Sequence, residues 1–119
     1  MSLKAEVRQA GDVSVVDLSG RITLGEGSGL VRSTIKDLVS SGRKNILLNL
    51  KNVSYIDSAG LGEVVGAYAT VSNVGGEIKL LHPQAKIKDL LTVTKLYTVF
   101  AAFDNEGEAL RSFATAAAL

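Results

Sequence analysis

The stretch Val53-Ser54-Tyr55-Ile56-Asp57-Ser58-Ala59-Gly60-Leu61-Gly62-Glu63-Val64-Val65 decides how this chain folds. An apolar run over residues 45–50 precedes it and is typical of a buried strand. After it, apolar residues recur at the spacing of one helical face, which predicts a helix that ends near Asn73. The residues of this predicted face are Leu61, Val64, Val65, Tyr68 and Ala69. The Asp57-Ser58 pair is therefore predicted at a turn from strand to helix.

Two features of this turn indicate more than a simple connection. Asp57 and Ser58 both suit a helix N-terminus, because a short side-chain oxygen accepts hydrogen bonds from the free N–H groups of the first turn. Gly60 and Gly62 each cost a helix roughly 1 kcal/mol relative to Ala. Two glycines here predict that another group approaches the helix backbone closely. Ser58 is then either an ordinary N-cap or a phosphoacceptor within a docking surface.

The remaining segments predict one α/β domain over residues 1–119. Strands over residues 3–9 and 13–19 are expected to form an antiparallel hairpin, and the glycine-containing segment 20–29 to form a loop. A first helix near residues 27–40 follows, with Gly42 as a left-handed cap. Its predicted buried face holds Leu30, Val31, Thr34, Ile35, Leu38 and Val39.

Beyond the Ser58 helix, a strand over residues 77–81 predicts a parallel βαβ crossover. A short helix over residues 84–92 with Ile87, Leu90 and Leu91 inward, a strand over 96–100 and a final helix from residue 104 complete the chain. The final helix is expected to bury Ala109, Leu110, Phe113 and Ala117, and Phe103 is expected in the core. The expected fold is a mixed sheet of four or five strands with about four helices.

Composition narrows the classes of function. Hydrophobic residues make up 46% of the 119 residues, which predicts a packed core. The formal charge is +1 without a Lys/Arg block, so direct nucleic-acid binding is not expected. Cysteine is absent, and no apolar run approaches the ~20 residues that span a bilayer. We expect a cytoplasmic protein that does not insert into membranes.

The sequence contains no residue pattern typical of a catalytic, metal-binding or nucleotide-binding site. The one histidine, His82, lies beside Pro83 and predicts a surface turn, and no cluster has metal-ligand spacing. The glycines of residues 20–29 match neither nucleotide-binding fingerprint. A receiver domain also carries an Asp where Asp57 stands, but residues 8–12 supply only one acid for its magnesium site. We expect no catalytic residue, no metal and no cofactor.

The string Asp57-Ser58-Ala59-Gly60-Leu61-Gly62 resembles the signature of STAS domains of the anti-sigma factor antagonist family. Leu-Ser-Gly-Arg-Ile at 18–22 and Gly-Gly-Glu-Ile-Lys-Leu at 75–80 extend the resemblance over nearly the whole chain. It implies a binding module whose unphosphorylated form captures an anti-sigma factor of the GHKL serine-kinase type and releases a sigma factor. The resemblance further implies that the kinase then phosphorylates Ser58 and that a PP2C-type phosphatase reverses the modification.

The resemblance also implies the partner-binding residues. They are Asp57, Ala59, Gly60, Leu61 and Gly62, with Ile22 and Thr23 from the preceding loop. Relatives commonly carry Asp where this chain has Thr23, so either the partner differs in charge or the loop is only structural; a second phosphosite at Thr23 also stays open. The alternative function is a STAS subunit of a lipid-transport ABC complex or a stressosome-type scaffold. A homodimer through the exposed first strand is a further alternative.

Overall fold

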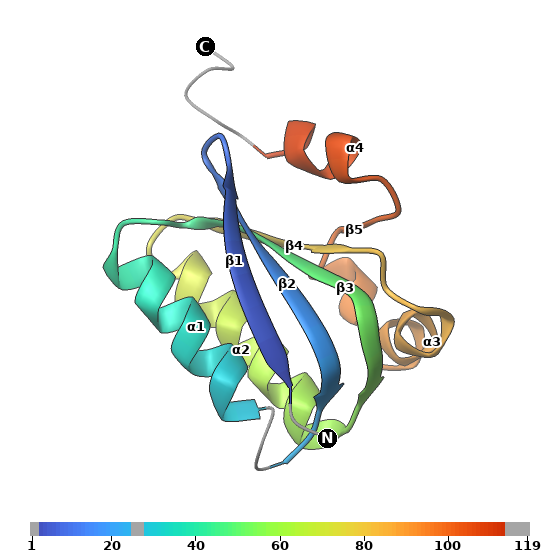
Figure 1. Ribbon diagram of the computed structural model, residues 1–119. Coiled ribbons are helices and arrows are strands. Elements are labelled where there is room, and N and C mark those ends of the chain that lie inside the picture. The colour runs from blue at the N-terminus through green and yellow to red at the C-terminus, as the bar shows by residue number, and fades with distance from the viewer. Residues whose placement is uncertain (1–2, 25–27, 114–119) are drawn as a thin grey trace.

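The computed structural model describes residues 3–24 and 28–113. Its elements alternate between strands and helices along the chain (Figure 1). The strands are β1 (Lys4–Ala10), β2 (Val13–Ile22), β3 (Asn45–Ile56), β4 (Glu77–Leu81) and β5 (Ala102–Phe103). The helices are α1 (Ser28–Ser40), α2 (Ser58–Ser72), α3 (Ala85–Val93) and α4 (Glu106–Arg111), with a short 3₁₀ helix over Leu96–Thr98.

The five strands form one sheet in the order β1-β2-β3-β4-β5. β1 and β2 pair antiparallel, whereas β2, β3, β4 and β5 pair in parallel. The predicted hairpin and the predicted parallel pairing across α2 are therefore confirmed. Gly42 has φ +84°, as expected for a left-handed helix cap.

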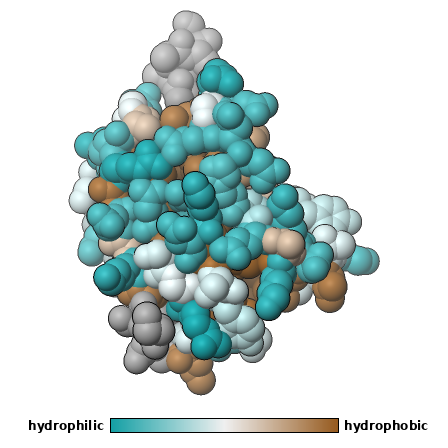
Figure 2. Space-filling view, turned by 45° about the vertical axis from the view of Figure 1, so that its right-hand side comes forward, coloured by the Kyte–Doolittle hydropathy of each residue, from teal (hydrophilic) through white to brown (hydrophobic). Residues whose placement is uncertain are grey.

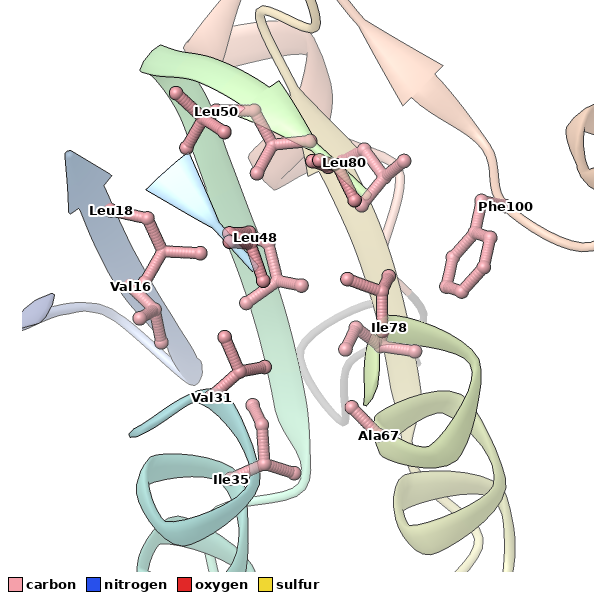
Figure 3. Close-up of a cluster of buried hydrophobic side chains, with 14 of the residues drawn as sticks. Val16, Leu18, Val31, Ile35, Leu48, Leu50, Ala67, Ile78, Leu80 and Phe100 are labelled. Carbon is pink, nitrogen blue, oxygen red and sulfur yellow. The ribbon is translucent and has the colours of Figure 1, made fainter. Parts of the chain in front are cut away.

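Two cores lie on opposite faces of the sheet. On one face, α1 and α2 lie side by side, and Val31, Ile35 and Ala67 meet apolar side chains of β2, β3 and β4 (Figures 1 and 3). On the other face, α4 covers only one end of the sheet, where Ala109 and Phe113 pack on a smaller cluster. The strand residues of that cluster are Val13, Val15, Leu47 and Leu81. The rest of the second face has no helix over it among the described residues (Figure 1).

Two predicted strand boundaries were wrong. β2 continues to Ile22, so residues 20–22 are strand rather than loop, and β3 continues to Ile56, directly before Asp57. The predicted strand over residues 96–100 is instead a 3₁₀ turn over Leu96–Thr98, in which the N–H of Val99 donates to the carbonyl of Leu96 at 2.9 Å. The fifth strand is the next pair of residues, Ala102–Phe103. Ala117 and the start of the first helix near Gly27 lie outside the described residues.

The predicted buried face of α2 also needs correction. The buried residues are Gly60, Val64, Ala67 and Val71, whereas Val65, Tyr68 and Ala69 are exposed. The prediction from sequence periodicity had placed Val65, Tyr68 and Ala69 on the buried face of the helix. In the structure the helix instead turns Gly60, Val64, Ala67 and Val71 toward the sheet. Five apolar residues of the predicted α1 face are buried or half-buried, as expected.

Candidate functional site

Asp57 links the end of β3 to the start of α2. It is the N-cap of α2, and its Oδ1 accepts a hydrogen bond from the Gly60 N–H at 2.7 Å. Its Oδ2 accepts from the Leu24 N–H at 3.0 Å. The bond from Gly60, followed by that from Leu24, holds the pKa of the Asp57 carboxyl below its usual range. Asp57 is thus an ionised residue that ties the segment after β2 to the first turn of α2.

Ser58 is the first residue of α2 and its side chain is exposed. Because Asp57 occupies the N-cap position, the interpretation of Ser58 as an ordinary N-cap is wrong. Within the described part of the chain, the Ser58 hydroxyl has no hydrogen-bond partner, in contrast to the hydroxyls of Ser41 and Thr70. The structure therefore presents this hydroxyl to solvent at a helix N-terminus.

The two glycines of the first turns of α2 have different surroundings. A Cβ added at Gly60 would lie 2.0 Å from the carbonyl oxygen of Ile22, so the group that approaches this backbone is the chain's own β2. A Cβ added at Gly62 would meet nothing within 4 Å. Gly62 is exposed, and among the described residues the fold gives no packing reason for its missing side chain.

Two of the predicted partner-binding residues therefore lie in the interior. Ile22 is 0% exposed and belongs to the main core, and Gly60 is buried against it. The side chain of Ile22 is not exposed, and its carbonyl packs against Gly60 at this turn. Ala59, Leu61 and Thr23 are half-buried, and Gly62 is exposed.

The structure adds apolar residues that the sequence reasoning missed. Leu24 is 78% exposed, and its backbone is held by Asp57. Val65 is exposed and shares one face of α2 with Ser58 and Gly62, at helical spacings of four and three residues. No signal in the sequence separated Val65 from the buried positions, since its apolar side chain fits either face. We call Ser58, Gly62, Val65 and Leu24 the Ser58 surface.

A groove of about 210 Å³ between α1 and α2 adjoins this surface at Gly62. Gly66 forms another part of its wall, and an ion pair between Arg32 and Glu63 lies in it. The second carboxylate oxygen of Glu63 is buried and accepts no hydrogen bond from the described residues.

No cluster of potential metal ligands occurs within residues 3–24 and 28–113. None of the described helices combines the length and apolar character needed to cross a bilayer.

Residues 4–109 match the STAS domain family. This chain belongs to that family, as the Asp57–Gly62 string predicted. The fold confirms the expected α/β class.

Curated relatives carry the names of regulators. The chain is 31% identical over 111 residues to the anti-sigma F factor antagonist of Paenibacillus polymyxa, covering 92% of this chain and 94% of the relative. It is 30% identical over 96 residues to the anti-sigma-B factor antagonist of Bacillus subtilis, covering 81% and 86%.

Solved structures agree in fold. The Thermotoga maritima protein TM1081 has a TM-score of 0.85 at 25% identity, covering 92% of this chain and 93% of that chain. The Bacillus cell fate determinant SpoIIAA in its phosphorylated form has a TM-score of 0.72 at 22% identity, covering 91% and 97%, which supports the fold alone.

Proposed function

We propose that this protein is an anti-sigma factor antagonist whose unphosphorylated form binds an anti-sigma factor of the GHKL serine-kinase type and thereby releases a sigma factor. The names of the relatives that span the same length support this class of function. The observation that carries the proposal is the Ser58 hydroxyl, which is exposed and unpartnered among the described residues and begins the helix that bears the family signature.

Phosphorylation of Ser58 is the proposed switch. It adds about −1.5 to −2 charges and three acceptor oxygens. The helix N-terminus tolerates an added anion, because its free N–H groups and dipole favour negative charge. The bound partner does not tolerate it, because a phosphate must be desolvated against Gly62 and Val65 and lies beside the ionised Asp57.

In this proposal the neighbouring residues have separate roles. Asp57 positions the turn, whereas Ala59, Leu61, Gly62 and Thr23 contribute to the contact surface. A PP2C-type phosphatase restores the binding form in the cytoplasm.

The test is binding to each anti-sigma factor of the GHKL class encoded in the source genome, purified singly and measured by calorimetry. We expect the wild-type chain to bind at least one of them. Ser58→Asp should weaken that binding about a hundredfold, or ~2.8 kcal/mol. Incubation with ATP should add one phosphoryl group, located at Ser58 by peptide mass mapping, and Ser58→Ala should abolish it.

Ser72→Asp provides the matched control, because Ser72 is exposed and lies at the far end of the same helix. It should bind as the wild type does. Equal affinity of Ser58→Asp and wild type would contradict the switch. Failure of every anti-sigma factor to bind, with co-purification of an ATP-binding cassette protein instead, would favour the transport alternative.

A further inference from the structure

The part of the second sheet face that α4 leaves uncovered carries an arginine stacked on a tyrosine. Arg21 and Tyr55 are paired neighbours on β2 and β3. The guanidinium carbon of Arg21 lies 4.9 Å from the centre of the Tyr55 ring. Ile22 points into the core between sheet and helices, so Arg21 points to the opposite face. The molecule seen from the side of this face is predominantly hydrophilic (Figure 2).

Arg21 has no carboxylate partner among the described residues, in contrast to Arg8 and Arg32. Arg8 binds Asp17 and Glu106, and Arg32 binds Glu63. The Arg21 guanidinium makes no ion pair with any residue of the described ranges. Stacking on a ring orients a guanidinium while leaving its N–H donors free at the edge, which suits recognition of a planar carboxylate.

The pair lies at the same end of the sheet as Ser58. Arg21 directly precedes Ile22, whose carbonyl accepts a hydrogen bond from the Asp57 N–H at 3.2 Å. Tyr55 lies two residues before Asp57 and is 43% exposed. The Arg21–Tyr55 pair and the Ser58 surface are therefore the two sides of one rim, the sheet face and the helix face.

A second cation reinforces the charge of this part of the sheet. Lys4 is exposed and pairs with Ser19, which lies two residues before Arg21 on the same face of β2. Residues 21–24 contain no acid, and the carboxylate of Asp57 at the same rim is bonded to the N–H groups of Gly60 and Leu24. A partner with a carboxylate at the matching position complements this charge, and one with a basic residue there is repelled.

We propose that the Arg21–Tyr55 pair is a specificity-determining part of the docking surface, which binds an Asp or Glu side chain of the anti-sigma partner. This inference rests on the proposed function. Arginine and tyrosine are among the residues that most often dominate the binding energy of protein interfaces, because they combine large contact area with directed hydrogen bonds. The pair thus selects among anti-sigma factors, whereas Ser58 decides when any of them binds.

The experiment uses the full chain and the anti-sigma factor that binds the wild type most tightly in the panel above. Arg21→Glu should lower the affinity at least tenfold, and Arg21→Lys should lower it severalfold because an ammonium lacks the planar pair of donors. The wild-type affinity should fall as the salt concentration rises from about 50 to about 300 mM, because salt screens the attraction between Arg21 and the partner's carboxylate. The affinity of Arg21→Glu should lose most of this salt dependence.

Arg43→Glu is the control for the change in net charge, because Arg43 is exposed in the turn before β3, at the other end of that strand. Its affinity should stay within twofold of wild type, and the thermal midpoints of all variants should agree. An affinity of Arg21→Glu equal to that of Arg43→Glu overturns this inference and leaves the proposed function standing. Absence of wild-type binding to the whole panel removes both.

Discussion

At the scale of single residues, the first turns of α2 place two glycines in opposite roles. Gly60 has no side chain because the carbonyl of Ile22 occupies the space, whereas Gly62 has none despite open surroundings. The sequence shows that both positions are unusual for a helix. It does not show which one is covered, because the covering carbonyl comes from β2, an element distant along the chain.

The two alanine substitutions should therefore have effects of opposite sign. Gly60→Ala should lower the free energy of unfolding by about 1–3 kcal/mol, since β2 and α2 must separate to admit the methyl group. Gly62→Ala should raise it by about 0.5–1 kcal/mol, through the better helix propensity of Ala. Urea unfolding of the two variants measures both changes, and equal effects would contradict the assignment of Gly60 to the interior.

At the scale of elements, the sequence predicted the helices and strands whose apolar periodicity is regular and whose ends carry turn or cap residues. The hairpin, α1, α2 and β4 follow from periodicity and glycine caps. The prediction of a strand over residues 96–100 was wrong. It rested on the apolar residues Leu96, Tyr97 and Val99, but the conformation of this segment is set by its contacts with the rest of the fold. Lys95 adopts φ +62° and starts a 3₁₀ turn instead, and buried Phe100 packs on Tyr68 of α2 at a centroid distance of 5.6 Å.

One part of the attachment of α4 was not predictable from periodicity, because it is made by a lysine of β4. The Lys79 ammonium donates to the Ser112 carbonyl at 2.8 Å and hydroxyl at 3.0 Å, and it lies 4.8 Å from the centre of the Phe113 ring. Lys79→Met keeps an apolar stem but removes the donor.

We expect Lys79→Met to cost about 1–3 kcal/mol of unfolding free energy. We also expect it to speed amide hydrogen exchange in α4 more than in α2. Lys86→Met in α3, an exposed position, is the comparison and should leave exchange in α4 unchanged. Uniform acceleration of exchange across all helices by Lys79→Met would argue against a local attachment.

At the scale of the whole molecule, one charged cluster joins three elements. Arg8 of β1 binds Asp17 of β2 at 2.7 Å and Glu106 of α4 at 2.6 Å. These hydrogen bonds hold the pKa of each carboxyl below its ordinary value, 3.8 for Asp17 and 4.5 for Glu106. A carboxylate with a lowered folded-state pKa adds stability above its ordinary pKa and loses it as pH falls through the lowered value.

The wild-type chain should therefore lose stability between about pH 5 and pH 3 more steeply than Arg8→Gln, in which both pKa values return toward their ordinary range. The groups are more than a third exposed, so the difference should be no more than about 1 kcal/mol. Urea midpoints at pH 7 and pH 3 measure it. Arg43→Gln should retain the wild-type slope, and a slope unchanged in Arg8→Gln would contradict the role of the cluster.

The proposed switch should leave the whole fold intact. Ser58→Asp adds an anion at the N-terminus of α2, where it is favourable by a few tenths of a kcal/mol. Its thermal midpoint should match or slightly exceed that of the wild type in a calorimetric scan. A fall of several degrees would mean that the negative charge acts by unfolding the domain rather than by blocking a surface.

The bonds of Asp57 to Leu24 and Gly60 have a practical consequence for engineering. They fix the backbone between β2 and α2 through main-chain N–H groups, independently of the side chains at positions 21 and 23. A library that randomises Arg21 and Thr23 while retaining Ile22, Asp57 and Gly60 should fold throughout. Such a library is a source of antagonist variants that each bind a different anti-sigma partner, so that several such pairs can work in one cell without binding one another's partners.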